Sequence, residues 1–155
     1  MKKFLLVCGL IVGLSFLTSF AHAEDESKDP GDYDAVLNME VVEHVAELDV
    51  FLNACMKLVR PGGVMVVATI NRTLASWLAA IVMGEYVLGW LPRGTHRWSR
   101  FPSPLEVETV LASEGMRVIS STGVGVNPFT RRFRLSSYMG INYIVAARKP
   151  LAQWL

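Results

Sequence analysis

The sequence is poor in cysteine and nearly neutral, and each of these shortages excludes a class of protein. Only two cysteines occur in 155 residues, and the formal net charge is +1. If Cys8 leaves with a leader segment, Cys55 has no partner, so no disulfide framework forms. The small charge offers nothing to a polyelectrolyte, and the chain has no zinc-finger spacing, DNA-reading helix or RNA-binding aromatic signature. We therefore expect no nucleic-acid partner.

The N-terminal apolar segment is too short for a comfortable membrane span, which takes about 20 residues. Lys2 and Lys3 precede it and Phe4–Leu17 form it. Ala21–Ala23 follow, with small residues at the two positions that a signal peptidase inspects. This order predicts a signal peptide over residues 1–23, and a secreted or periplasmic location if the signal is used. An uncleaved membrane anchor is the alternative.

The length allows one domain at most. Residues 24–32 are acidic and contain a Pro-Gly pair, so we expect a flexible linker there. Residues 33–150 remain as the folded part, and they contain no internal repeat.

From residue 33 onward, short apolar runs alternate with segments of helical periodicity. Uninterrupted apolar runs are typical of strands that are buried on both faces of a parallel sheet. The expected strands are Tyr33–Asn38, Val64–Ile70, Met116–Ser120 and Ile141–Ala147, and the expected helices are Leu48–Val59 and Pro104–Glu114. Pro61-Gly62-Gly63 is expected to end the first helix. The sequence thus predicts an α/β fold, a partial doubly wound sheet with helices on its faces.

The clearest candidate site follows the first of these strands. Met39 stands at the strand end, and Glu40, Glu43 and His44 follow at spacings of three and four. If a helix begins here, the last three share one face. Two carboxylates and an imidazole can bind a divalent cation or move a proton, and ligands of open α/β sheets lie at the carboxyl ends of the strands. Acidic capping of a helix N-terminus is the structural alternative.

Several motifs in fixed order carry a family resemblance. They are Met39-Glu40-Val41-Val42-Glu43-His44, Pro61-Gly62-Gly63, Thr69-Ile70-Asn71-Arg72-Thr73, Leu91-Pro92-Arg93-Gly94-Thr95-His96, Asn127-Pro128-Phe129 and Asn142-Tyr143. This order resembles the class I, S-adenosylmethionine-dependent methyltransferases, and among them the ubiquinone biosynthesis O-methyltransferases. The resemblance runs from Tyr33 to Lys149 and corresponds to the C-terminal half of a Rossmann-like methyltransferase domain.

The resemblance implies O-methylation of a polyprenylated phenol or catechol, with S-adenosylmethionine as cofactor. It makes Met39 the cofactor contact and makes Glu40, Glu43 and His44 the ligands of a magnesium ion, although an imidazole ligand also admits Mn²⁺ or Zn²⁺. The metal would lower the pKa of a catechol hydroxyl before methyl transfer. His44 as general base is the alternative.

The chain departs from this family in its first residues. A complete enzyme of the class has a strand with a glycine-rich cofactor loop, and then a second strand that ends in a ribose-binding acid. We find neither before Tyr33, so the resemblance predicts a truncated protein that is inactive alone. The alternative from another class is an exported, non-catalytic remnant that binds a membrane or a partner protein.

Three further segments have local interpretations. Thr73–Leu91 is strongly apolar, and the resemblance implies that residues 73–100 contact a membrane surface, since relatives act at the inner face of a membrane. Cys55 lies on an apolar helical face with no base beside it, which predicts a buried structural thiol. Arg131, Arg132 and Arg134 lie in a predicted loop or hairpin, Asn127–Ser137, and are expected to form a solvated face.

Overall fold

The computed structural model describes residues 2–8, 31–79, 81–82, 97–127, 130 and 132–151. Its six strands form one mixed sheet in the order β1-β2-β3-β6-β4-β5. The strands are β1 (Phe4–Cys8), β2 (Tyr33–Met39), β3 (Val59–Ile70), β4 (Arg117–Asn127), β5 (Arg132–Ser136) and β6 (Asn142–Arg148). Strands β1, β2 and β3 are parallel, whereas β6 pairs antiparallel with both β3 and β4, and β5 pairs antiparallel with β4.

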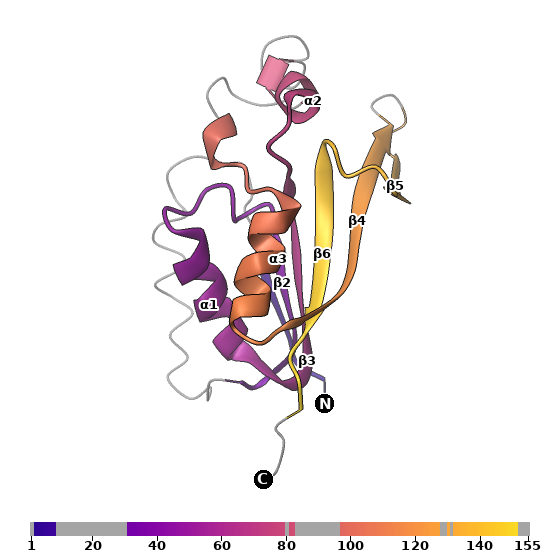
Figure 1. Ribbon diagram of the computed structural model, residues 1–155. Helices are drawn as coiled ribbons and strands as arrows, with labels where there is room; N and C mark the ends of the chain where they lie inside the picture. The colour runs from indigo at the N-terminus through magenta and orange to yellow at the C-terminus, as the bar shows by residue number, and fades with distance from the viewer. Residues whose placement is uncertain are drawn as a thin grey trace.

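Two long helices, α1 (Leu48–Leu58) and α3 (Pro104–Ser113), cover one face of this sheet (Figure 1). A short helix, α2 (Leu74–Ser76), follows β3, and a 3₁₀ turn, η3 (Trp98–Arg100), precedes α3. The start of α3 is a capping box. The hydroxyl of Ser103 accepts from the backbone N–H of Glu106, and the Glu106 carboxylate accepts from the Ser103 N–H at 2.6 Å. This reciprocal pair satisfies two of the free N–H groups of the first turn.

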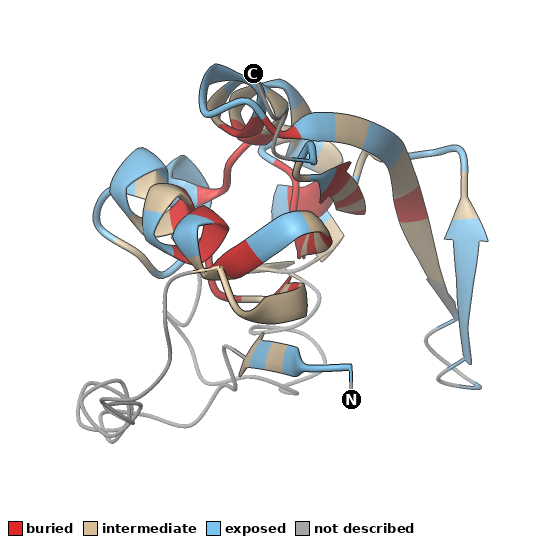
Figure 2. Cartoon of the chain, turned by 90° about the horizontal axis from the view of Figure 1, so that it is seen from below, coloured by how far each residue is buried: buried red, intermediate tan, exposed pale blue. Residues whose placement is uncertain are grey.

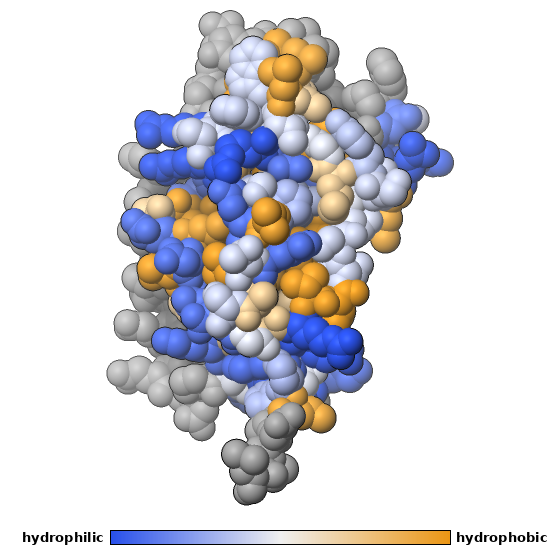
Figure 3. All heavy atoms as spheres, in the orientation of Figure 1, coloured by the Kyte–Doolittle hydropathy of each residue, from blue (hydrophilic) through white to orange (hydrophobic). Residues whose placement is uncertain are grey.

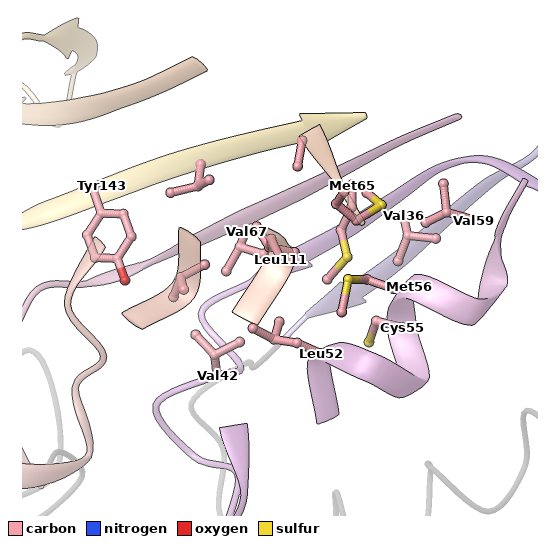
Figure 4. Close-up of a cluster of buried hydrophobic side chains, with 14 residues drawn as sticks. Val36, Val42, Leu52, Cys55, Met56, Val59, Met65, Val67, Leu111 and Tyr143 are labelled. Atoms are coloured by element: carbon pink, nitrogen blue, oxygen red, sulfur yellow. The ribbon is translucent and has the colours of Figure 1, made fainter. Parts of the chain in front are cut away.

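The core lies between the two helices and the sheet (Figure 2). Strand residues that point toward the helices are fully buried, and α1 contributes three buried side chains at helical spacing. In Figure 4, Leu52, Cys55 and Met56 of α1 face Val36 and Met65 of the sheet. The alternation of buried and half-buried positions along β2 and β6 follows from the two-residue period of a strand.

The structure confirms the predicted α/β class and each of the predicted strands and helices, with shifted ends. The first helix ends at Leu58, and Pro61-Gly62-Gly63 lies inside β3, which begins at Val59 rather than at Val64. Gly62 has a φ of +77°, a conformation that favours glycine. For the segment Asn127–Ser137 the sequence left a loop and a hairpin open. The structure favours the hairpin, because β5 pairs antiparallel with β4.

One interpretation was wrong. The helical turn considered for Glu40–His44 is absent, since Glu40 is a bend, residues 42–44 form a turn, and α1 begins only at Leu48. Glu40 has a φ of +53°, which interrupts any regular helix at that point.

The first strand was not expected. Phe4–Cys8 pairs with Ala35–Met39 of β2 as a parallel edge strand. The predicted signal peptide of residues 1–23 and the linker of residues 24–32 fall mostly outside the described residues, and both stay predictions. No described helix is both long enough and apolar enough to cross a membrane.

Lys149, the residue after β6, stabilises the C-terminal end of α1. Its ammonium group donates to the carbonyl oxygens of Met56 at 3.0 Å and Val59 at 2.7 Å, carbonyls at the end of the helix. A cation at this position stabilises both the free carbonyls and the helix dipole.

We expect Lys149→Met to lower the free energy of unfolding by about 2 kcal/mol, because two charge-assisted hydrogen bonds are lost while the apolar stem is kept. Urea unfolding followed by circular dichroism measures the change. Lys57→Met is the control, since Lys57 is exposed in the last turn of the same helix. An equal loss in both variants would contradict the capping role.

Candidate functional site

The candidate site lies where β2 and β3 end at the same edge of the sheet. Met39 pairs with Ala68 in the parallel ladder, and the Glu40 backbone N–H donates to the Ala68 carbonyl at 2.9 Å. The turn that follows Met39 is thereby fixed to the neighbouring strand.

Glu40 occupies the left-handed region of the backbone map, which a side chain with a Cβ adopts only at a cost of about 1–3 kcal/mol. Among the described residues it is the one non-glycine with this conformation. Such strain persists where surrounding contacts impose it, and it is found most often at functional sites.

Glu43 is buried behind this turn, with 3% of its surface exposed. The Thr69 hydroxyl donates to Glu43 Oε2 at 2.6 Å, while Oε1 is buried and has no hydrogen-bond partner in the described part of the chain. Asn38 is also buried, and its Nδ2 lacks a partner in the same way. Buried polar atoms without partners are rare, so two at one strand end mark an unusual place in the fold.

The two glutamates act on each other. Burial and, second, the nearby charge of Glu43 raise the pKa of Glu40 to about 8. Like charges in a poorly solvated place resist joint ionisation, so the Glu40 carboxyl holds a proton at neutral pH.

A cavity of about 480 Å³ opens beside Met39 and Glu40. Its apolar walls come from Met39, Ala68, Val124, Phe133, Leu135 and Ile144. Glu40 and Asn142 supply polar groups, and Arg134 also lines it. The volume lies within the range of small-molecule sites, about 300–1,000 Å³, and the apolar lining with few polar groups is typical of them.

Of the four residues that the sequence predicted for the site, only two line this cavity. Met39 and Glu40 line it, whereas Glu43 lies buried behind the turn. His44 is exposed and is not part of the lining, and its backbone N–H donates to the Val41 carbonyl at 2.8 Å.

The residues present do not fit the predicted magnesium site. Within the described ranges, no three His, Cys, Asp or Glu side chains converge as metal ligands. Glu40 and Glu43 are neighbours, but one Glu43 oxygen is already taken by Thr69, and His44 does not join them. We therefore derive no step through a metal ion.

The predictions for Cys55 and for the arginine cluster can also be compared with the structure. Cys55 is confirmed as a buried thiol, with a pKa raised to about 11 by burial, and its Sγ lies 3.5 Å from Asn38 Oδ1. Arg131 is not among the described residues. Arg132 and Arg134 are exposed, as expected, but they lie on β5, and Arg134 also lines the cavity.

Sequence reasoning gave no role to Thr69 or Asn142, although both stand in the motifs that carry the resemblance. Thr69 is fully buried against Glu43, and Asn142 begins β6 beside the end of β3. Thr69 meets Glu43 across 26 positions of the chain, and Asn142 meets Ile70 through the pairing of β6 with β3. No local sequence pattern reveals either contact.

Comparisons with known proteins identify the family of the chain. The Methyltransferase domain family matches residues 14–121. The chain belongs to this family. The match begins inside the segment predicted as a signal peptide, which stays a prediction.

Individual relatives show which methyltransferases the chain resembles most specifically among those compared. The chain is 48% identical over 134 residues to the ubiquinone biosynthesis O-methyltransferase of Chelativorans sp. (strain BNC1), covering 86% of this chain and 53% of that protein. It is 51% identical over 119 residues to the enzyme of the same name from Sinorhizobium fredii, covering 77% of this chain and 48% of that protein. The chain thus spans about half the length of the curated relatives it matches.

Solved structures support the fold alone, because their identities are low. A SAM-dependent methyltransferase from Archaeoglobus fulgidus aligns with a TM-score of 0.60 at 14% identity, over 96% of this chain and 86% of that one. A possible histamine N-methyltransferase from Thermotoga maritima aligns with a TM-score of 0.55 at 14% identity, over 82% and 61%. The fold of the chain is the class I methyltransferase fold.

The raised pKa of Glu40 makes stability depend on pH. Between the ordinary value of 4.5 and the folded value of about 8, the folded chain holds a proton that the unfolded chain has lost. The free energy of unfolding should therefore fall as pH rises through this window. We expect Glu40→Gln to flatten that decline and to unfold at a higher urea concentration than the wild type near the upper end of the window.

The measurement is the urea midpoint at several pH values across this window. Glu47→Gln is the control, since it removes an exposed carboxyl that precedes α1. A decline of the same slope in wild type and Glu40→Gln would show that Glu40 is not the titrating group.

Proposed function

We propose that the chain is the acceptor-side half of an S-adenosylmethionine-dependent O-methyltransferase whose substrate is a polyprenylated phenol or catechol. The observation that carries the proposal is the apolar cavity beside Met39 and Glu40, at the carboxyl ends of β2 and β3. The printed names of the relatives, ubiquinone biosynthesis O-methyltransferase, favour this acceptor class.

S-adenosylmethionine, when bound, supplies a methyl group on a sulfonium centre. Met39 lines the cavity at the end of β2, and in the proposal its side chain packs against the cofactor. The backbone bond from Glu40 to Ala68 fixes the turn, so this contact is positioned before any ligand arrives.

Glu40 is the acid–base group that we assign to the reaction. It lines the cavity, and its pKa of about 8 lies near neutral pH, where a general base is most effective. Above this pKa the deprotonated Glu40 carboxylate accepts the proton that the phenolic hydroxyl loses, as the phenolic oxygen takes the methyl group and the carbon–sulfur bond of the cofactor breaks. His44, the base considered from the sequence, is exposed and lies outside the cavity lining.

Membrane-surface contact through residues 73–100 belongs to the same proposal, because a polyprenyl acceptor resides in lipid. Much of this segment lies outside the described residues. Among those described, Leu74 is 76% exposed and Leu78 is 52% exposed, and Figure 3 shows apolar atoms at the end of the molecule that carries α2. Exposed apolar side chains at one end favour an interfacial contact.

We expect the isolated chain to show negligible methyl transfer, because the sequence has no recognisable glycine-rich cofactor loop and positioning supplies much of the rate. A chimera should be active. In it, residues 33–149 of this chain replace the matching segment of the Chelativorans relative. The measurement is transfer of labelled methyl groups to a geranylated catechol. A folded but inactive chimera would contradict the proposal.

Within that chimera, Glu40→Gln should reduce the turnover number by about 100-fold or more, which is the usual contribution of a general base. The cofactor affinity should stay nearly unchanged. Glu47→Gln is again the matched control. If the loss in Glu40→Gln is no larger than in Glu47→Gln, Glu40 has no role in proton transfer.

A further inference from the structure

We propose that one face of the sheet, the one against which neither long helix packs, is a docking surface for a second polypeptide. The partner that we assign to it is the N-terminal half of a methyltransferase domain, the part of the longer relatives that this chain does not match. The inference rests on the proposed function, because it names the partner that completes the same site.

The two long helices pack on the same face of the sheet, α1 against β2 and β3, and α3 against β4 and β6 (Figure 1). Two strand residues mark this face. Val36 of β2 belongs to the core, and Ser121 of β4 donates a hydrogen bond to Glu108 of α3. Because side chains alternate along a strand, Leu37 and Thr122 point to the opposite face.

Strand register carries an apolar surface across this opposite face. Leu6, Leu37, Val66 and Ala146 form one row over β1, β2, β3 and β6. The next row leads into the cavity and includes Met39, Ala68 and Ile144. We call these two rows the open face.

The open face is apolar and accessible at both of its sides. Leu6 on β1 is 60% exposed, and Leu135 on β5, which lines the same cavity, is 71% exposed. Between them Leu37, Val66 and Ala146 are only half-buried. A contiguous apolar surface of this kind marks a place where another molecule binds.

The parallel strands explain why this molecule should be a protein segment with helices. Parallel sheets are normally covered on both faces, and α/β domains place helices on each side. Strands β1, β2 and β3 are parallel, yet α1 and α3 cover only one side of them. The second layer of helices therefore has to come from outside the described part of the chain.

The length of the relatives indicates which protein segment this is. The chain covers 53% of the Chelativorans protein and 48% of the Sinorhizobium fredii protein. The resemblance assigns the matched part to the C-terminal half of the domain, so the unmatched N-terminal half is available to form the second layer. Because the cavity wall belongs to the open face, a partner docked there would also close the cavity.

Charge at one end of the open face indicates how the partner lies on it. Arg148 follows Ala146 by two positions, so it points to the same side, and it is the direct cross-strand neighbour of Arg117. Both arginines are exposed, and no ion pair within the described ranges includes either of them. Like charges placed opposite one another are unfavourable, and acidic side chains of a partner would relieve the repulsion.

The test measures association between two separate polypeptides. The probe is the segment of the Chelativorans relative that precedes its match to residues 33–149 of this chain, fused to a soluble carrier. We expect the full chain to bind the probe with a Kd of about 1 μM or tighter, as specific interfaces of standard size do. Binding no stronger than to the carrier alone would overturn the inference.

Substitutions at exposed positions locate the contact without disturbing the core. Leu6→Lys and Leu135→Lys should each weaken binding about tenfold, because a charge enters an apolar contact. Leu105→Lys is the matched control, since Leu105 is 72% exposed on α3, on the helix side. Urea midpoints establish that the three variants are folded. Equal losses in all three would show that the open face is not the contact.

The arginine pair is tested through the association rate. Arg148→Glu should slow association about tenfold at low salt, because it reverses a charge that attracts acidic groups of the partner. Lys57→Glu makes the same change in net charge at an exposed position of α1 and should have a smaller effect. Equal effects of the two variants would contradict the role of the arginine pair.

The remaining outcomes separate this inference from its alternatives. A dimer of the chain alone that Leu6→Lys dissociates would make a second copy the occupant of the open face and overturn the assignment. Association that depends on Leu6, combined with an inactive chimera, would contradict the proposed function and leave the docking surface standing. An active chimera whose two halves do not associate as separate polypeptides would contradict the docking surface alone.

Discussion

The parallel pairing of β2 with β3 is the constraint on which the site depends. Parallel strands end at the same edge of a sheet, so Met39 and Ala68 come level with one another. The Glu40 N–H then reaches the Ala68 carbonyl, and the chain turns into the buried Glu43. Helix α1 makes this pairing possible, because a parallel crossover needs a connection of a dozen or more residues.

The same turn keeps features that oppose stability. Glu40 has a strained backbone and a carboxyl that holds its proton, and one oxygen of Glu43 has no hydrogen-bond partner within the described ranges. The Thr69 hydroxyl offsets part of this by binding the other Glu43 oxygen. A packed apolar turn would be more stable, and this cost is the reason to treat the polar turn as a candidate site.

Much of the fold could be predicted from the sequence, because its elements are encoded locally. The apolar runs around Val36 and over Val64–Ile70 predicted the central strands β2 and β3. Ser103-Pro104 predicted the start of α3. Two strands at the edges of the sheet were harder. The apolar run of β1 also suits a signal peptide, and the alternating Arg132–Ser136 looks like a solvated hairpin until its pairing with β4 is known.

The candidate site could be predicted only in part, since spacing along the chain does not determine direction in space. The spacing of Glu40, Glu43 and His44 suggested one helical face, but the left-handed Glu40 redirects the chain, so Glu43 is buried and His44 is exposed. Proximity along the sequence therefore does not bring His44 to the cavity beside Glu40.

Asn142, one of the residues to which the sequence analysis gave no role, reaches the site through the topology of the sheet. The sheet changes from parallel to antiparallel between β3 and β6, so β6 begins at the edge where β3 ends. Asn142 thereby joins Met39 and Glu40, although it lies far along the chain. An additional parallel strand would present its last residue at that edge, and Asn142 would lie at the opposite end. The antiparallel direction of β6 is thus what brings the amide of Asn142 to a cavity whose walls are mostly apolar.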